Sequence, residues 1–94
     1  MNSVAKKLNQ EFFAINVFFT DEVIGIVLSD GREVRVPLDF YPRLKNASST
    51  QQNNFEIIGL GTCIHWPDID EDLSVEGIIL GLKQFNIVFL KNYQ

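Results

Sequence analysis

The sequence predicts a small α+β domain led by an antiparallel β-meander. Three strand-like segments follow one another at about residues 12–19, 23–29 and 32–36, and valines alternate with charged residues in the last of them. Between the second and third segments, Asp30-Gly31 indicates a hairpin, because a two-residue turn of the primed type needs positive φ, which Asp tolerates and Gly permits freely. A chain of 94 residues has room for one domain, so we expect a single domain over residues 1–94.

A short helix is expected after the meander, in the segment LDFYPRLKNA, residues 38–47. Asp39 is its predicted N-terminal cap, and Pro42 lies near the first turn, where a missing N–H costs little. Leu44 and Ala47 would then face inward. The helix cannot be long, because the segment SSTQQNN follows it directly.

The second half of the chain alternates between polar and apolar segments. Residues 48–54 contain no apolar side chain and predict a solvated loop, after which FEIIGLG resumes extended structure. A short helix is predicted at about 75–81, ending near Gly81. Residues 82–94 form a tail whose pattern fits either an extended or a helical segment.

The composition argues against several classes of function. Eight basic and twelve acidic residues give a net charge of −4 without any cluster of Lys and Arg, so we expect no direct binding to nucleic acid. A basic protein partner is compatible with this charge.

The apolar runs are interrupted and fall short of the roughly 20 residues of a spanning helix, so we expect no membrane association. The single cysteine cannot form an internal disulfide, which indicates a reducing compartment and a cytoplasmic protein.

The stretch GTCIHWPDIDEDLS, residues 61–74, holds the chain's only Cys, His and Trp and four of its acidic residues. Cys63 and His65 would share one face of a strand and could supply half of a zinc site, but the chain has no second Cys or His to complete it. The same pair does not predict nucleophilic catalysis, because parallel side chains two residues apart lack an orienting third group. We therefore expect no enzyme activity and no cofactor.

Asp68, Asp70 and Asp72 occupy the first, third and fifth positions of a calcium-binding loop. The sixth position should be Gly and is Leu73, and the twelfth should be Glu and is Ile79. The motif thus fails twice. These carboxylates alone would support only a weak, partly hydrated divalent site.

A structural interpretation explains the same stretch. Ile64 and Trp66 would lie on the face opposite Cys63 and His65, so we expect the tryptophan in the core. His65 would hydrogen-bond a nearby carboxylate or carbonyl and hold the turn. Residues 70–72 would precede a helix that begins near Ser74, where a capping side chain and negative charge suit the first turn.

The segments DGREVRVPLDFYPRLKNA and GTCIHWPDIDEDLSVEGIILG resemble the bacterial domain of unknown function 2442 (DUF2442) family over about residues 12–81. The resemblance implies a small α+β cytoplasmic protein of prokaryotes or their mobile elements, with no established enzymatic activity. Some relatives carry a helix-turn-helix module after the domain, and others lie beside toxin-like genes. The segment after Gly81 is too short for two helices, so we expect no autonomous DNA binding. The matching positions are Asp30, Gly31, Leu38, Tyr41, Pro42, Leu44, Ala47, His65, Trp66, Pro67, Asp70, Glu71, Asp72, Leu73, Ser74, Val75 and Gly77.

The leading hypothesis is a non-enzymatic protein-interaction domain, an adaptor or the antitoxin-like member of a pair, with a protein partner or a second copy of itself. One alternative is a small metal-binding, ligand-binding or enzymatic site around Cys63, His65 and the acidic turn. Another is an accessory of a transcription regulator that acts through a DNA-binding partner. The candidate residues of the interaction or structural turn are His65, Trp66, Asp68, Asp70, Glu71 and Asp72, and those of the tail contact are Phe85, Ile87, Phe89 and Leu90.

Overall fold

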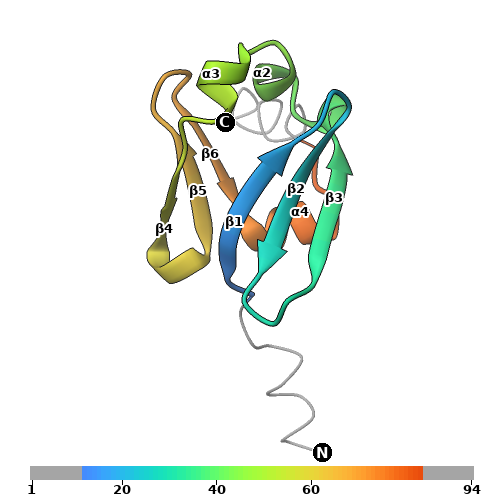
Figure 1. Ribbon diagram of the computed structural model, residues 1–94, viewed down its shortest axis with the longest axis vertical. Helices are drawn as coiled ribbons and strands as arrows, with labels where there is room; N and C mark the ends of the chain where they lie inside the picture. Colours follow the sequence, from blue (N-terminus) through green and yellow to red (C-terminus); the bar gives the residue numbers. More distant parts are fainter. Residues whose placement is uncertain (1–11, 84–94) are drawn as a thin grey trace, which may run out of the picture.

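The structure of the protein, a computed structural model, describes residues 12–83 and consists of two three-stranded antiparallel sheets with short helical segments (Figure 1). The predicted α+β class with an N-terminal meander is confirmed. The strands of the first sheet are β1 (Ala14–Phe19), β2 (Val23–Leu28) and β3 (Glu33–Pro37). Those of the second are β4 (Glu56–Ile58), β5 (Cys63–Trp66) and β6 (Glu71–Ser74). The helical segments are η1 (Leu38–Phe40), α2 (Pro42–Lys45), α3 (Ser49–Gln52), η2 (Gly59–Gly61) and α4 (Val75–Leu80).

The first sheet follows the predicted meander, but its hairpin turn differs from the prediction. The Leu28 N–H donates to the Arg32 carbonyl at 2.8 Å, and the Gly31 N–H donates to the Leu28 carbonyl at 2.9 Å. The loop between β2 and β3 therefore has three residues instead of two, and within it only Gly31 has positive φ, at 93°. A three-residue loop needs a left-handed backbone only at its last position, so the Asp30 backbone keeps negative φ.

The predicted helix after the meander is split into η1 and α2. Asp39 does not cap it, because the residue before α2 is Tyr41 and no side chain accepts a capping hydrogen bond there. The Asp39 carboxylate instead pairs with the ammonium group of Lys45. Pro42 opens α2 and Leu44 is fully buried, as predicted.

The predicted solvated loop over residues 48–54 is wrong, because these residues contain the short helix α3. The Ser48 hydroxyl accepts from the Gln51 N–H at 3.1 Å, and the Gln51 side chain accepts from the Ser48 N–H at 2.9 Å. This reciprocal capping box stabilises the first turn of a helix that buries no apolar residue. The Gln52 carbonyl at its end accepts a hydrogen bond from the indole N–H of Trp66 at 2.9 Å.

The second sheet also extends further than predicted. The sequence predicts only that residues 70–72 precede a helix that begins near Ser74, but Glu71–Ser74 form the strand β6, in which Leu73 pairs with Ile64 and Glu71 with Trp66. The predicted helix near 75–81 is confirmed as α4, capped by the Ser74 hydroxyl and ended by Gly81 in the left-handed conformation.

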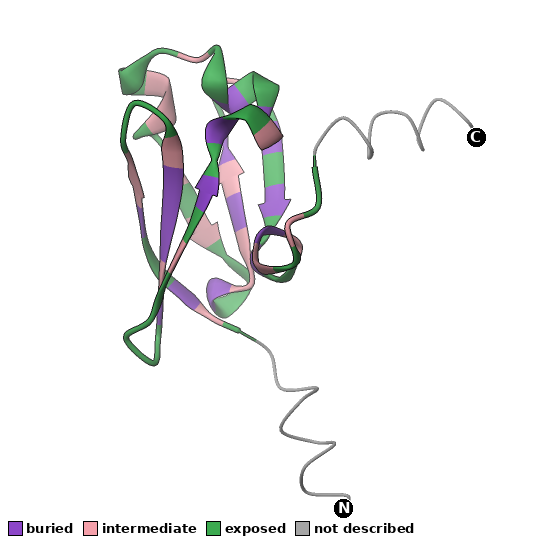
Figure 2. Ribbon diagram, turned by 90° about the vertical axis from the view of Figure 1, so that its right-hand side faces the viewer, coloured by how far each residue is buried: buried purple, intermediate pink, exposed green. Residues whose placement is uncertain are grey.

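Apolar residues of both sheets meet in one core, and buried residues alternate with more exposed ones along β5 and β6 (Figure 2). Trp66 is fully buried, and its indole lies 6.4 Å from the ring of Phe19 in the first sheet and 6.4 Å from that of Phe55 before β4, between ring centroids. The prediction that Trp66 belongs to the core is confirmed. The buried apolar residues are Ala14, Val17, Ile24, Ile26, Leu28, Val36, Leu38, Tyr41, Leu44, Ile64, Trp66, Leu73, Val75 and Ile78.

Two further predictions concern membrane association and the C-terminal tail. Within residues 12–83, no helix is long and apolar enough to cross a membrane. The candidate tail contact, residues 85–90, lies outside the described residues.

The segment η2 lies against the start of β1 through Gly61. The φ of Gly61 is 99°, and a Cβ added to it would lie 2.8 Å from the carbonyl oxygen of Ala14 and 3.1 Å from its nitrogen. Because both neighbours are backbone atoms, they cannot rotate away. Gly61 thus permits close approach between the two sheets.

We expect Gly61→Ala to lower the free energy of unfolding by about 2–4 kcal/mol, through left-handed strain and the contact with Ala14. Gly31→Ala is the matched control, because φ is 93° there and an added Cβ meets nothing within 4 Å. Its loss should be about 1–2 kcal/mol. Urea unfolding of both variants measures the difference, and equal losses would show that Gly61 does not hold the sheets together.

Candidate functional site

The outward face of the second sheet carries a row of polar side chains across its three strands. In this row Glu56 of β4 and Asp72 of β6 flank His65 of β5. The Nδ1 atom of His65 lies 2.6 Å from Oδ1 of Asp72, so the imidazole has the carboxylate partner that the structural interpretation predicts. His65 therefore joins two strands at the surface.

Cys63 lies on the same face as His65, but the structure does not activate its thiol. Burial raises the pKa of the Cys63 thiol, and the negative charge of Asp72 raises it further. Among the described residues, no hydrogen bond joins the thiol to His65, and its Sγ lies 4.0 Å from the carbonyl oxygen of Ile64. A thiol with a raised pKa stays protonated near neutral pH and is a poor nucleophile.

The acidic residues of the turn do not converge on a common point. Over residues 12–83, no group of three or more His, Cys, Asp or Glu side chains is arranged to hold a metal ion. Asp68 accepts a hydrogen bond from the side chain of Asn54 at 3.0 Å, and Asp70 is exposed in the left-handed conformation with φ 52°. Asp72 faces His65 instead of the other two carboxylates.

Two of the candidate turn residues are buried and hold the turn from inside. Trp66 is fully buried, and Glu71, its partner across the strands, is 5% exposed. The Arg43 Nε lies 3.8 Å from the Glu71 carboxylate, and the Arg43 Nη2 donates to the carbonyl of Ile69 at 2.5 Å. Arg43 thereby ties α2 to the turn between β5 and β6. The exposed acidic members are Asp68, Asp70 and Asp72.

The fold brings other carboxylates to the same end of the molecule. Figure 1 shows the turn between β1 and β2 and the turn between β5 and β6 at one end, with α2 and α3 beside them. The first turn and η1 border a hollow of 370 Å³, lined by Asp21, Glu22, Pro37, Leu38, Asp39 and Lys45. We call the exposed carboxylates Asp21, Glu22, Asp39, Asp68 and Asp70 the acidic end.

Of the five carboxylates of the acidic end, the sequence predicts as contact candidates only the two in the turn between β5 and β6, Asp68 and Asp70. Asp21 and Glu22 are some fifty residues from that turn in the chain, and only the packing of the two sheets places both turns at one end. The sequence signal that could have found Asp21 and Glu22 is that their loop is acidic, as is the loop that contains Asp68 and Asp70.

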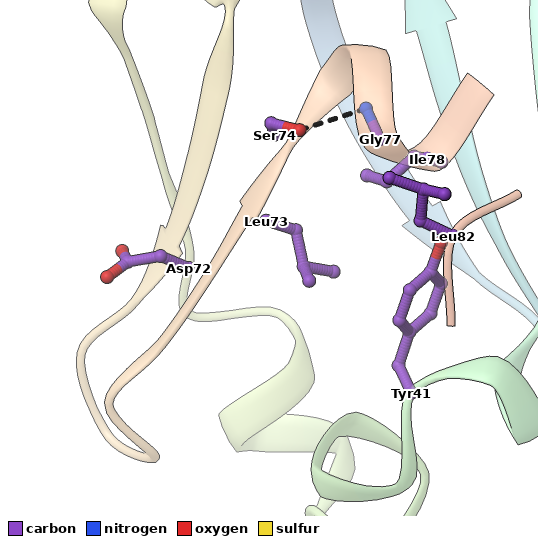
Figure 3. Close-up of a pocket in the computed structure, with 7 residues that line it drawn as sticks. All are labelled: Tyr41, Asp72, Leu73, Ser74, Gly77, Ile78 and Leu82. Carbon is purple, nitrogen blue, oxygen red and sulfur yellow. Dashed lines mark hydrogen bonds between the residues drawn. The ribbon is translucent and has the colours of Figure 1, made fainter. Parts of the chain in front are cut away.

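A pocket between β6, α4 and the start of α2 was not predicted either. It is lined by Tyr41, Asp72, Leu73, Ser74, Gly77, Ile78 and Leu82 (Figure 3). Tyr41 is 1% exposed, and its hydroxyl has no hydrogen-bond partner among the described residues. The sequence places Tyr41 beside Pro42 in a helical segment and gives no sign of the pocket.

Comparison with known proteins identifies the family of this chain. A family model described as "Protein of unknown function (DUF2442)" matches residues 14–84. A crystal structure of a protein of unknown function from Rhodospirillum rubrum is similar, with 28% sequence identity, a TM-score of 0.69, and coverage of 79% of this chain and 92% of that one. A solution NMR structure of an uncharacterised protein from Chromobacterium violaceum has a TM-score of 0.66 and covers 86% of this chain and 74% of that one. Its identity is 20%, so it shows likeness of fold alone. No curated protein matches the chain.

We expect iodoacetamide to alkylate Cys63 several-fold more slowly in the folded protein than in the urea-unfolded chain, because burial and Asp72 raise the pKa of the thiol. Asp72→Asn removes the second cause and should raise the rate about two- to threefold at mildly alkaline pH. Glu56→Gln removes a carboxylate from the other side of His65 and should leave the rate unchanged. Mass spectrometry of timed samples gives the rates. Faster alkylation of the folded protein would instead indicate an activated thiol.

Proposed function

The chain belongs to the DUF2442 family of proteins of unknown function, and we propose that it is a non-enzymatic protein-interaction domain whose acidic end binds a basic protein partner. Its part in the cell would be that of an adaptor, or of the antitoxin-like member of a pair, in the cytoplasm. The observation that carries the proposal is an excess of exposed carboxylates at one end of the molecule.

The charge of the described residues supports a basic partner. Residues 12–83 contain five basic and eleven acidic residues, a net charge of −6. Each of the five cations already has a contact within the protein. The pairs are Arg32 with Asp30, Arg35 with Glu33, Arg43 with Glu71, Lys45 with Asp39, and Lys83 with the ring of Phe40. The remaining carboxylates of the acidic end are therefore left to attract cations from outside, and long-range attraction of this kind speeds association.

The turn between β5 and β6 offers this charge on a fixed backbone. Arg43 holds the carbonyl of Ile69, and the Asn54 side chain holds the carboxylate of Asp68. A turn that is already ordered loses less conformational entropy when a partner binds. The acidic end is thus suited to recognition without a large rearrangement.

The chemistry of the second sheet gives no support to an enzyme. The thiol of Cys63 has a raised pKa, and His65 already contacts Asp72. Within residues 12–83 the acidic side chains form no group that could hold a metal ion. A recognition role uses the carboxylates as charges and needs neither nucleophile nor metal.

The test is affinity purification of the tagged protein from its native host, with the wild type and the double variant Asp21→Lys/Asp68→Lys. We expect a stoichiometric basic partner that the variant loses by roughly tenfold or more, because two attractive charges become repulsive and each contributes on the order of 1 kcal/mol. Recovery should also fall as salt is raised, since exposed charges are screened. Quantitative mass spectrometry measures the partner.

The matched control is Glu33→Lys/Glu76→Lys, which changes the net charge by the same amount at exposed positions outside the acidic end. It should retain the partner. Equal loss in both variants would mean that overall charge, and not the acidic end, attracts the partner. Full retention by Asp21→Lys/Asp68→Lys, or the absence of any stoichiometric partner, would contradict the proposal.

A further inference from the structure

The pocket beside α4 is separate from the acidic end and has walls of a different chemistry. Its volume is 60 Å³, against the roughly 10–15 Å³ that one water molecule needs. The space thus admits about four to six non-hydrogen atoms. Its apolar walls are the side chains of Leu73 and Ile78, both buried, and of Leu82, which is 53% exposed at the mouth.

Tyr41 is a fully buried residue with a polar group among those that line this pocket. Figure 3 shows its ring rising from the start of α2 with the hydroxyl directed at Leu82. The backbone around it is fixed, because the Tyr41 N–H donates to the Leu38 carbonyl and the Tyr41 carbonyl accepts from the Lys45 N–H, both at 2.9 Å. Buried hydroxyls in folded proteins nearly always have a partner, and this one has none among the described residues.

The hydroxyl is a hydrogen-bond donor at physiological pH. Burial raises the pKa of the Tyr41 phenol to about 12, so the group keeps its proton and its neutral form. The neutral phenol can donate its proton in a hydrogen bond, and a carbonyl oxygen is a group that can accept it. The Ser74 hydroxyl has a partner in the protein, since it accepts from the Gly77 N–H at 2.9 Å, whereas the Tyr41 hydroxyl has none among the described residues.

The surroundings disfavour charged occupants. No Lys or Arg lines the pocket, so a buried anion would lack a counter-charge. The carboxylate of Asp72 points away from the pocket in Figure 3 and contacts His65, so a buried cation would lack a counter-charge. An uncharged occupant avoids both penalties.

We propose that this pocket binds a small uncharged aliphatic ligand that carries one carbonyl oxygen, which accepts a hydrogen bond from the Tyr41 hydroxyl while the aliphatic part contacts Leu73, Ile78 and Leu82. The ligand would give a partner to the Tyr41 hydroxyl, the buried side-chain polar atom that the described residues leave without one. The binding does not depend on the acidic end.

The test is a titration of the isotopically labelled full-length protein with isobutyramide, a branched aliphatic amide of suitable size, followed by amide chemical shifts. We expect saturable shifts confined to the pocket, at Leu73, Ser74, Gly77 and Leu82, with millimolar affinity as befits so small a ligand. Tyr41→Phe should fold at least as stably as the wild type, because it removes an unpartnered hydroxyl, and should bind about fivefold more weakly.

Isobutyrate and isobutylammonium have the same branched body with opposite charges, and both should bind at least about tenfold more weakly than the amide. Equal affinity of wild type and Tyr41→Phe for isobutyramide would overturn the proposal, because the hydroxyl would then play no part. It would also fail if the ammonium ion bound as tightly as the amide, or if no saturable shifts occurred, in which case the pocket holds only water.

Discussion

The burial of Trp66 is the constraint on which the rest of this structure depends. A chain of 94 residues has little surface to bury, and its one tryptophan contacts three separate parts of it. The indole packs against Phe19 of the first sheet and Phe55 before β4, and its N–H bonds the carbonyl of Gln52 at the end of α3. Both sheets and the helical segment between them are therefore fixed relative to one side chain. Since Trp66 ends β5, the turn that carries Asp68 and Asp70 begins directly at this fixed point.

The alternation of β5 divides the second sheet into a side that faces the core and a side that faces solvent. The buried pair of Trp66 and Glu71 faces the core, and Arg43 reaches from α2 to Glu71 and to the turn. Tyr41, the residue before this short helix, lines the pocket, and its hydroxyl points toward Leu82. The acidic end and the pocket thus share a support while differing in chemistry, because one presents negative charge to water and the other presents a neutral donor in an apolar hollow. The outward pair of His65 and Asp72 is part of the sheet surface.

Local signals predicted the meander, the faces of β5 and the ends of α4, because period-two alternation, a capping Ser74 and a left-handed Gly81 act over a few residues. Prediction failed where polar residues form regular structure. Because α3 has no apolar residue, its sequence predicts a loop despite the capping box at Ser48. The charged residues of β6 favour a helix start over a strand. The wider acidic end and the Tyr41 pocket depend on contacts between segments far apart in the chain. No local pattern carries that information.

The most direct test of this account is native-state hydrogen exchange at Ile26 in β2 and Ile64 in β5, the central strands of the two sheets. If Trp66 joins the sheets into one cooperative unit, both amides should exchange only through global unfolding, with equal free energies of opening. A free energy lower at Ile64 by more than about 1 kcal/mol would mean that the second sheet opens alone. The turn between β5 and β6 would then not be held by the core, which would contradict the account.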